Sequence, residues 1–140
     1  MNYYNEIKNK LIDNKVYKEV KDYSKNKNDL TTYYAVGKLL YEAGNKYGEG
    51  IIKKYSERLV IEVGRNYNER TLRRIRQFYL VFKDEIWSTM STKLMWSHYT
   101  EILSLSNINE INYSINITEE YNLSVRELRE RLKTKNIKYY

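Results

Sequence analysis

The 140-residue chain has no cysteine, no proline, five glycines and one histidine. The absence of cysteine excludes disulfides, thiolate nucleophiles and metal sites built on sulfur. Without proline and with little glycine, few positions interrupt helices. The longest apolar run, residues 78–82, is far too short to cross a bilayer, and the opening "MNYYNEIKNK" lacks the apolar segment of a signal peptide. We therefore expect a helical protein of the cytoplasm that makes no contact with a membrane.

The sequence offers no credible set of catalytic residues. His98, the only histidine, lies in "MWSHYTEIL", a setting more typical of a hydrogen-bonded core residue than of a catalyst or ligand. The segment "GNKYGEG" lacks the spacing of a phosphate-binding loop. E-x-K triplets at residues 6–8 and 19–21 resemble a nuclease motif, but they lie in lysine-rich helical sequence, where this spacing arises by chance. We expect no metal, no cofactor and no enzyme activity.

The charges are unevenly distributed along the chain. The 25 Lys and Arg against 18 Asp and Glu give a net charge of +7. Residues 53–76 carry eight basic and three acidic side chains, residues 84–123 carry one and six, and residues 124–140 carry six and two. A segregated basic surface favours a polyanionic partner, because each neutralised phosphate releases counterions. A lysine-rich chain that is merely soluble would show a similar total charge.

Tyrosine is unusually abundant, with sixteen residues. Asparagine, lysine, tyrosine and isoleucine share A/T-rich codons, so the base composition of the genome explains much of this abundance. The number of tyrosines alone therefore does not indicate stacking sites.

The spacing of apolar residues predicts an all-α fold: one compact multi-helix domain, residues 1–140, that contains a helix-turn-helix-like unit. No segment alternates with a period of two. Two helices are expected before the glycine-rich break at residues 42–50, and the second is expected to be capped within "NKND", residues 26–29. Their inward-facing residues would be Ile7, Leu11, Val16, Val20 and Tyr23, then Leu30, Tyr33, Tyr34, Gly37, Leu40 and Tyr41.

The later helices follow the same logic. A third helix is expected to end at Gly64 in a left-handed C-cap, and Asn66 or Asn68 is expected to cap the next one. "SVRE", residues 124–127, has the spacing of a capping box before the last helix. The inward-facing residues would be Ile51, Ile52, Tyr55, Leu59 and Val63, then Trp96, Tyr99, Ile102, Leu103 and Leu105, then Ile108, Ile111, Ile115 and Tyr121, and finally Leu128 and Leu132.

The segment "RTLRRIRQFYLVF", residues 70–82, combines four arginines with an aromatic run. At about 100° per residue, a helix separates these groups onto two faces. Arg76 lies at the boundary between them. The apolar face holds Leu72, Ile75, Phe78, Tyr79 and Phe82, and the opposite face holds Arg70, Arg73, Arg74 and Gln77.

Residues 51–82 together suggest a helix-turn-helix, in which the second helix enters the major groove of DNA. Arginine can read guanine and glutamine can read adenine, while the turn and the helix N-terminus can hold phosphate. The alternative is a solvated face of a core helix, but four arginines with Glu69 as the single acidic partner argue against it. The predicted DNA-contacting residues are Arg65, Asn66, Asn68, Arg70, Arg73, Arg74, Arg76 and Gln77.

Five segments occur in an order that resembles a known family. They are "LTTYYAVGKLLYEAG", "KYGEGIIKKYSERL", "RTLRRIRQFYLVF", "LMWSHYTEILSL" and "NLSVRELRERLK". Over residues 3–135 the chain resembles the N-terminal domain of YhcG-type proteins, bacterial proteins in which a PD-(D/E)xK nuclease domain follows. The resemblance implies a helical domain with a DNA-binding, helix-turn-helix-like unit, in a family linked to restriction-modification or mobile-element genes.

Because the nuclease domain would begin where this chain ends, we expect no catalytic residue of that domain here. The leading hypothesis is a non-catalytic, self-associating domain that binds duplex DNA. The alternative is a protein–protein interaction module, in which the acidic residues 84–123 pair with the basic ends or the domain docks on a nuclease or defence complex. A stand-alone copy would then act as an inhibitor or decoy.

Overall fold

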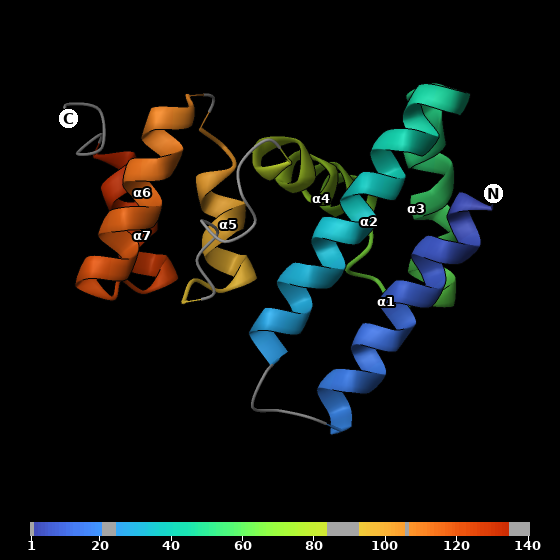
Figure 1. Cartoon of the computed structure of the whole chain (residues 1–140), viewed down its shortest axis with the longest axis horizontal. Helices are drawn as coiled ribbons and strands as arrows, with labels where there is room; N and C mark the ends of the chain where they lie inside the picture. The colour runs from blue at the N-terminus through green and yellow to red at the C-terminus, as the bar shows by residue number, and fades with distance from the viewer. Residues whose placement is uncertain (1, 21–24, 84–92, 106, 135–140) are drawn as a thin grey trace. The chain divides into compact units, whose positions relative to one another are not determined.

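The computed structural model describes residues 2–20, 25–83, 93–105 and 107–134, and it describes their side chains except those of residues 17–20 and 25–28. The described part of the chain is helical and contains no strand, which confirms the predicted all-α class (Figure 1). The helices divide into an N-terminal unit, Met1–Asp84, and a C-terminal unit, Glu85–Tyr140. The helices are α1 (Tyr3–Val20), α2 (Lys25–Tyr47), α3 (Gly50–Glu62), α4 (Glu69–Phe82), α5 (Trp96–Ile102), α6 (Ile108–Tyr121) and α7 (Val125–Lys133).

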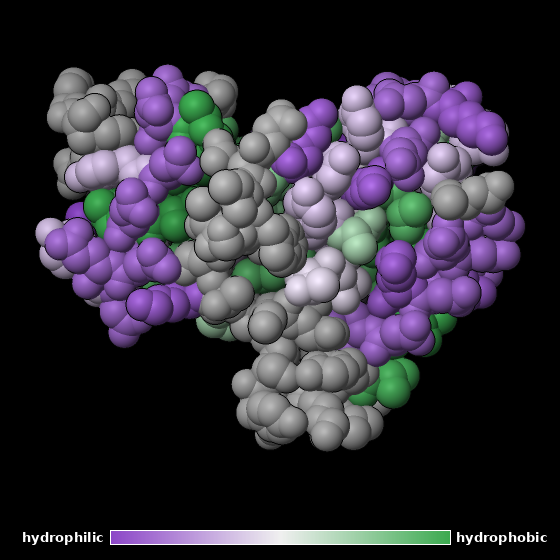
Figure 2. Space-filling model, viewed as in Figure 1, coloured by the Kyte–Doolittle hydropathy of each residue, from purple (hydrophilic) through white to green (hydrophobic). Residues whose placement is uncertain are grey.

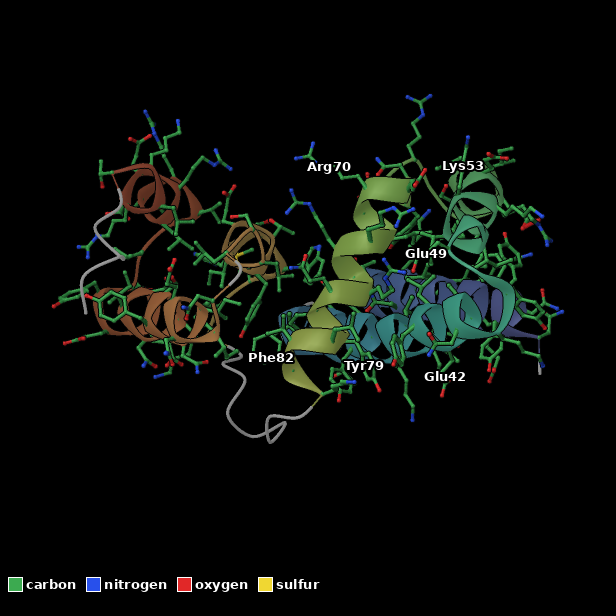
Figure 3. The ribbon with its side chains drawn as sticks, turned by 90° about the horizontal axis from the view of Figure 1, so that it is seen from above. Glu42, Glu49, Lys53, Arg70, Tyr79 and Phe82 are labelled. Carbon is green, nitrogen blue, oxygen red and sulfur yellow. The ribbon has the colours of Figure 1, made fainter. Side chains whose placement is uncertain are left out.

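In the N-terminal unit, α2 is the central helix and packs against α1, α3 and α4. Figure 1 shows α1 and α2 running antiparallel, and Figure 3 shows α4 crossing α2. Apolar residues of all four helices form the core, as the helical spacing predicts. They are Tyr4, Ile7, Leu11, Leu30, Tyr33, Val36, Leu39, Leu40, Ala43, Ile52, Tyr55, Leu59, Leu72, Ile75, Phe78 and Phe82.

The crossing of α2 and α4 depends on Gly37. A Cβ atom at this position would lie 2.5 Å from the carbonyl oxygen of Ile75 and 2.7 Å from the Cβ atom of Tyr79. The Tyr79 ring continues the contact, with its centroid 5.2 Å from that of Tyr34 and 5.9 Å from that of Tyr41. The missing side chain of Gly37 thus lets the two helix backbones approach closely and fixes the position of α4.

Several predicted boundaries in the N-terminal unit are wrong. Helix α2 begins at Lys25, so residues 26–29 lie within it and do not form its N-cap. The helix also continues through Gly44, and the break falls at Gly48, which has a φ of +91°. Gly64 has no positive φ, so the predicted left-handed C-cap is absent. Val16, predicted to face inward, is exposed. The side chains of Val20 and Tyr23 lie outside the described residues.

In the C-terminal unit, α5 packs against both α6 and α7. His98 on α5 is buried, and its two ring nitrogens are both used. The backbone N–H of Met95 donates to Nδ1 at 3.0 Å, and Nε2 donates to the carbonyl oxygen of Leu123 at 2.9 Å. The imidazole therefore joins the start of α5 to the segment before α7, which confirms that His98 is a hydrogen-bonded core residue.

In α6 and α7 one prediction is confirmed and another is wrong. The predicted capping box is confirmed, because Ser124 Oγ accepts from the backbone N–H of Glu127 at 3.1 Å and the Glu127 carboxylate accepts from the backbone N–H of Ser124 at 2.9 Å. Ile108 and Tyr121, predicted to face inward, are exposed. They are the first and the last residue of α6.

The visible face of the N-terminal unit is mostly hydrophilic over α1 and the C-terminal end of α2, with small separate hydrophobic areas (Figure 2). None of the helices that the structure describes is both long and apolar enough to cross a membrane.

Candidate nucleic-acid interface

The predicted interface begins in residues 63–68, the connection between α3 and α4. This connection is longer than the turn of about 3–4 residues that is typical of a helix-turn-helix. Its last residue, Asn68, is the N-cap of α4, because its side-chain oxygen accepts from the backbone N–H of Thr71 at 3.0 Å. Of the two predicted candidates, Asn66 and Asn68, the structure selects the second. Arg65 and Asn66 lie in the connection and are exposed. The side-chain oxygen of Asn68 therefore caps α4, whereas Arg65 and Asn66 face solvent.

Helix α4 has two faces, as its spacing predicts. Leu72, Ile75, Phe78 and Phe82 are buried, and Tyr79 is half-buried against α2. Burial of this apolar stripe, at about 25 cal/mol per Å² of apolar surface, holds the helix on α2. The polar face is then free to carry charge. Figure 3 shows Arg70 pointing away from the N-terminal end of α4, with Phe82 at the other end.

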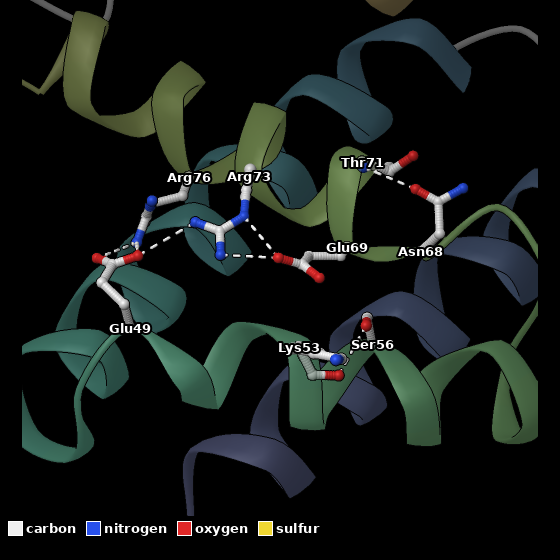
Figure 4. A network of polar contacts seen from close by, with 8 residues as sticks. All are labelled: Glu49, Lys53, Ser56, Asn68, Glu69, Thr71, Arg73 and Arg76. Carbon is white, nitrogen blue, oxygen red and sulfur yellow. Dashed lines mark hydrogen bonds and ion pairs between the residues drawn. The ribbon is translucent and has the colours of Figure 1, made fainter.

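Two of the α4 arginines are bound by acidic residues. Arg73 donates to Glu69 at 2.8 and 3.0 Å and to Glu49 at 3.2 Å. Arg76 donates to both carboxylate oxygens of Glu49, at 2.8 and 3.0 Å (Figure 4). The expectation that Glu69 is the single acidic partner of these arginines is therefore wrong. Glu49 precedes α3 and lies on the side of α4 that faces α3 (Figure 3).

The pKa directions agree with this pairing. Hydrogen bonds from Arg76, and next from Arg73, lower the pKa of Glu49, so its carboxylate stays charged. Hydrogen bonds to Glu69, and next to Glu49, raise the pKa of Arg73. Arg76 is only 18% exposed and lies beside α2, whereas Arg73 is 41% exposed. The arginine stripe is thus partly neutralised along the side that faces α3.

The remaining predicted residues differ in their environment. Arg74 and Gln77 are half-buried and interact with other residues, so neither is without a partner. Arg65 and Arg70 are exposed, and within the described ranges no hydrogen bond or ion pair engages either guanidinium. Arg65 in the connection and Arg70 in the first turn of α4 are therefore available cations, unlike Arg73 and Arg76, which acidic residues bind.

The two units differ in net charge, and this difference appears only when the charges are counted on either side of the boundary between the units. Residues 1–84 contain 18 Lys and Arg and 11 Asp and Glu, a net charge of +7, whereas residues 85–140 contain seven of each and are neutral. Lys53 and Lys54 are exposed on α3. They belong to the basic segment of residues 53–76, but they are not among the predicted DNA-contacting residues. Glu49 was missed altogether. Its only sequence signal is its position between Gly48 and Gly50.

Among the residues that the structure describes, no group of three or more His, Cys, Asp or Glu side chains is arranged to hold a metal ion. No curated protein and no solved structure matches the chain. The family model of the DUF1016 N-terminal domain matches residues 6–138, which is nearly the whole chain. The chain therefore belongs to the DUF1016 N-terminal domain family.

Proposed function

We propose that this chain binds duplex DNA through its N-terminal unit. The observation that carries the proposal is the location of the charge, since the entire excess of +7 belongs to residues 1–84. A unit with this charge attracts a phosphate backbone at long range, because binding releases condensed counterions. A chain that needed charge only for solubility would have no reason to concentrate the excess in one unit.

The start of α4 is the part of this unit best suited to phosphate. Arg65 precedes this helix, Arg70 lies in its first turn, and both are exposed. The N-terminus of a helix also carries the positive end of the helix dipole and backbone N–H groups that can bind an anion. Asn66 lies between the two arginines in the sequence and is also exposed. Arg74 and Gln77 follow along α4 and supply side chains that can reach base edges.

Glu49 limits how many arginines take part. Its carboxylate occupies Arg73 and Arg76 at hydrogen-bonding distance, in the way that a phosphate would. Arg65 and Arg70 therefore make the first contacts with DNA, and Arg73 joins them only when its bonds to Glu69 and Glu49 are broken. Glu49 therefore competes with DNA for these arginines and lowers the affinity of the chain for DNA.

The resemblance to YhcG-type proteins extends the proposal to the biological setting. We propose that the chain acts together with a PD-(D/E)xK nuclease in a bacterial restriction or mobile-element system and that it self-associates. In this setting the helical domain supplies DNA affinity and the nuclease supplies the chemistry.

A fluorescence-anisotropy titration with a labelled duplex at low salt tests the proposal. The double variant Arg65→Glu, Arg70→Glu should bind at least about tenfold more weakly, because two phosphate contacts become repulsive. The matched control is Arg126→Glu, Lys133→Glu, which changes the net charge equally on exposed positions of α7. Equal losses in both variants, or no binding by the unmodified protein, would contradict the proposal. Circular dichroism checks that each variant is folded.

One observation favours a second function for the C-terminal unit. This unit is neutral, and it exposes the apolar side chains of Met95, Ile108 and Tyr121. Large exposed apolar residues on a unit without net charge suit a protein partner better than a phosphate backbone. We propose that this unit mediates self-association or docking on a protein partner. Light scattering of the protein alone gives the mass, and Ile108→Lys should lower it if self-association uses this surface.

A further inference from the structure

An open pocket of about 440 Å³ lies in the N-terminal unit, where the start of α1, the end of α2 and α3 meet. Its volume lies within the range of ligand pockets, about 300–1,000 Å³. The lining includes Tyr3 and Tyr4 of α1, Tyr47 of α2, and Ile51, Tyr55 and Arg58 of α3. Four of the sixteen tyrosines are therefore brought together from three helices.

The tyrosine rings form two contacting pairs. The Tyr4 and Tyr55 centroids are 5.4 Å apart with their planes at 56°, and both residues are buried. The Tyr3 and Tyr47 centroids are 6.4 Å apart in an edge-to-face arrangement, and Tyr47 is 54% exposed. The buried pair provides rigid walls, and the outer pair offers ring faces that a flat ligand can reach. Aromatic walls of this kind stack on any nucleobase, because every base has a π-face.

Two cations accompany these rings. The guanidinium carbon of Arg58 lies 3.8 Å from the Tyr4 ring centroid, and the Lys46 amine lies 5.5 Å from that of Tyr47. Glu62 is the carboxylate next to the pocket. It accepts a hydrogen bond from the Tyr4 hydroxyl and pairs with Arg58 at 3.6 Å and with Lys8 at 3.8 Å. Three cations, Arg58, Lys8 and Lys46, thus accompany the single carboxylate of Glu62, and this positive excess favours an anion.

Tyr55 adds a hydroxyl group to the residues that line the pocket. Within the described residues no hydrogen bond engages it. Burial, and next the neighbouring Tyr47 and Tyr3 hydroxyls, raise the pKa of Tyr55, so it remains a neutral phenol that can donate to a ligand. The pocket therefore combines stacking surfaces, a hydrogen-bond donor and cations.

We propose that this pocket binds an unpaired nucleobase of single-stranded nucleic acid, with the base stacked on the Tyr3–Tyr47 pair and the adjoining phosphate held by Arg58 and Lys46. The proposal does not rest on duplex binding, because none of these residues belongs to the start of α4. A chain with both sites would hold duplex DNA and an adjacent unpaired strand at once.

The test is an anisotropy titration of the full chain with a fluorescein-labelled oligothymidylate and, separately, with the duplex. Tyr47→Ala should weaken oligothymidylate binding roughly tenfold, the loss expected for one stacked base. Tyr47→Phe should keep the affinity, because the ring remains. The matched control is Tyr121→Ala, since Tyr121 is 57% exposed and has Arg131 over its ring at 5.3 Å.

The outcomes separate this proposal from duplex binding. Tyr47→Ala should leave duplex affinity unchanged, whereas Arg65→Glu, Arg70→Glu should weaken duplex binding. The proposal is wrong if the unmodified protein does not bind oligothymidylate, or if Tyr47→Ala and Tyr121→Ala weaken it equally. It is also wrong if Tyr47→Ala changes only the mass in light scattering, because the pocket would then contact protein.

Discussion

The contact between α2 and α4 makes a sharp prediction about two glycines on one helix. Gly37 and Gly44 are two turns apart on α2, and alanine is favoured over glycine in a helix by about 1 kcal/mol. A Cβ atom at Gly44 meets nothing closer than the Arg76 guanidinium at 3.8 Å. Gly44→Ala should therefore raise the free energy of unfolding by about 0.5–1 kcal/mol.

At Gly37 the same substitution meets the carbonyl oxygen of Ile75 at 2.5 Å and the Cβ atom of Tyr79 at 2.7 Å. Neither atom can be moved by rotating a side chain, so the helices must separate. Overpacking costs about 1–3 kcal/mol, and the rigid neighbours place Gly37→Ala at the upper end. After the propensity gain, we expect a net loss of about 2 kcal/mol.

Urea unfolding followed by circular dichroism at 222 nm measures both variants against the unmodified chain. The urea concentration at the midpoint of unfolding should rise for Gly44→Ala and fall for Gly37→Ala. The slope of the unfolding free energy against urea concentration should change little. Similar effects from both substitutions would refute the inference that Gly37 sets the distance between α2 and α4. The result bears on function, because this crossing fixes the direction of the arginines on α4.

Three further predictions test other parts of the structure. Glu49→Gln should tighten duplex binding several-fold at low salt, because it removes the carboxylate that pairs with Arg76 and leaves Arg73 paired with Glu69 alone; unchanged affinity would contradict the competition between Glu49 and DNA. His98→Ala should lower the free energy of unfolding by roughly 2–4 kcal/mol in urea, because the Met95 N–H and the buried Leu123 carbonyl lose their hydrogen bonds, whereas exposed Ser97→Ala should change little. Burial, and next the bond to Glu62, raise the pKa of Tyr4 to about 12, so its contribution to stability is present below pH 10 and is lost between about pH 10 and 12. Tyr4→Phe should flatten this alkaline decline in unfolding experiments.

The sequence predicted the features that depend on local spacing. The apolar stripe of α4, the N-cap at Asn68 and the capping box at Ser124 all involve residues three or four positions apart. Each follows from the geometry of one helix and its first turn. The hydrogen-bonded role of His98 was also predictable, because a lone histidine beside aromatics has few alternatives.

The features that the sequence missed depend on distant residues. Glu49 binds Arg73 and Arg76, which follow it by 24 and 27 positions, so no local pattern links them. The tyrosine pocket draws on α1, α2 and α3, and its spacing has no period. The position of Gly37 opposite α4 is equally long-range, although the glycine itself was expected to face inward. Packing between helices decides each of these, and helical periodicity does not contain that information.

The most direct test of the account is the salt dependence of duplex binding. For each phosphate that a protein neutralises, log Kobs changes with log[salt] by a slope of about −0.9. The neutral variant Arg65→Gln, Arg70→Gln should reduce the magnitude of the slope by about 2, because two phosphate contacts are removed. The unmodified protein should bind at low salt with a steep slope. Absence of binding, or a slope that both proteins share, would contradict the claim that the start of α4 contacts DNA.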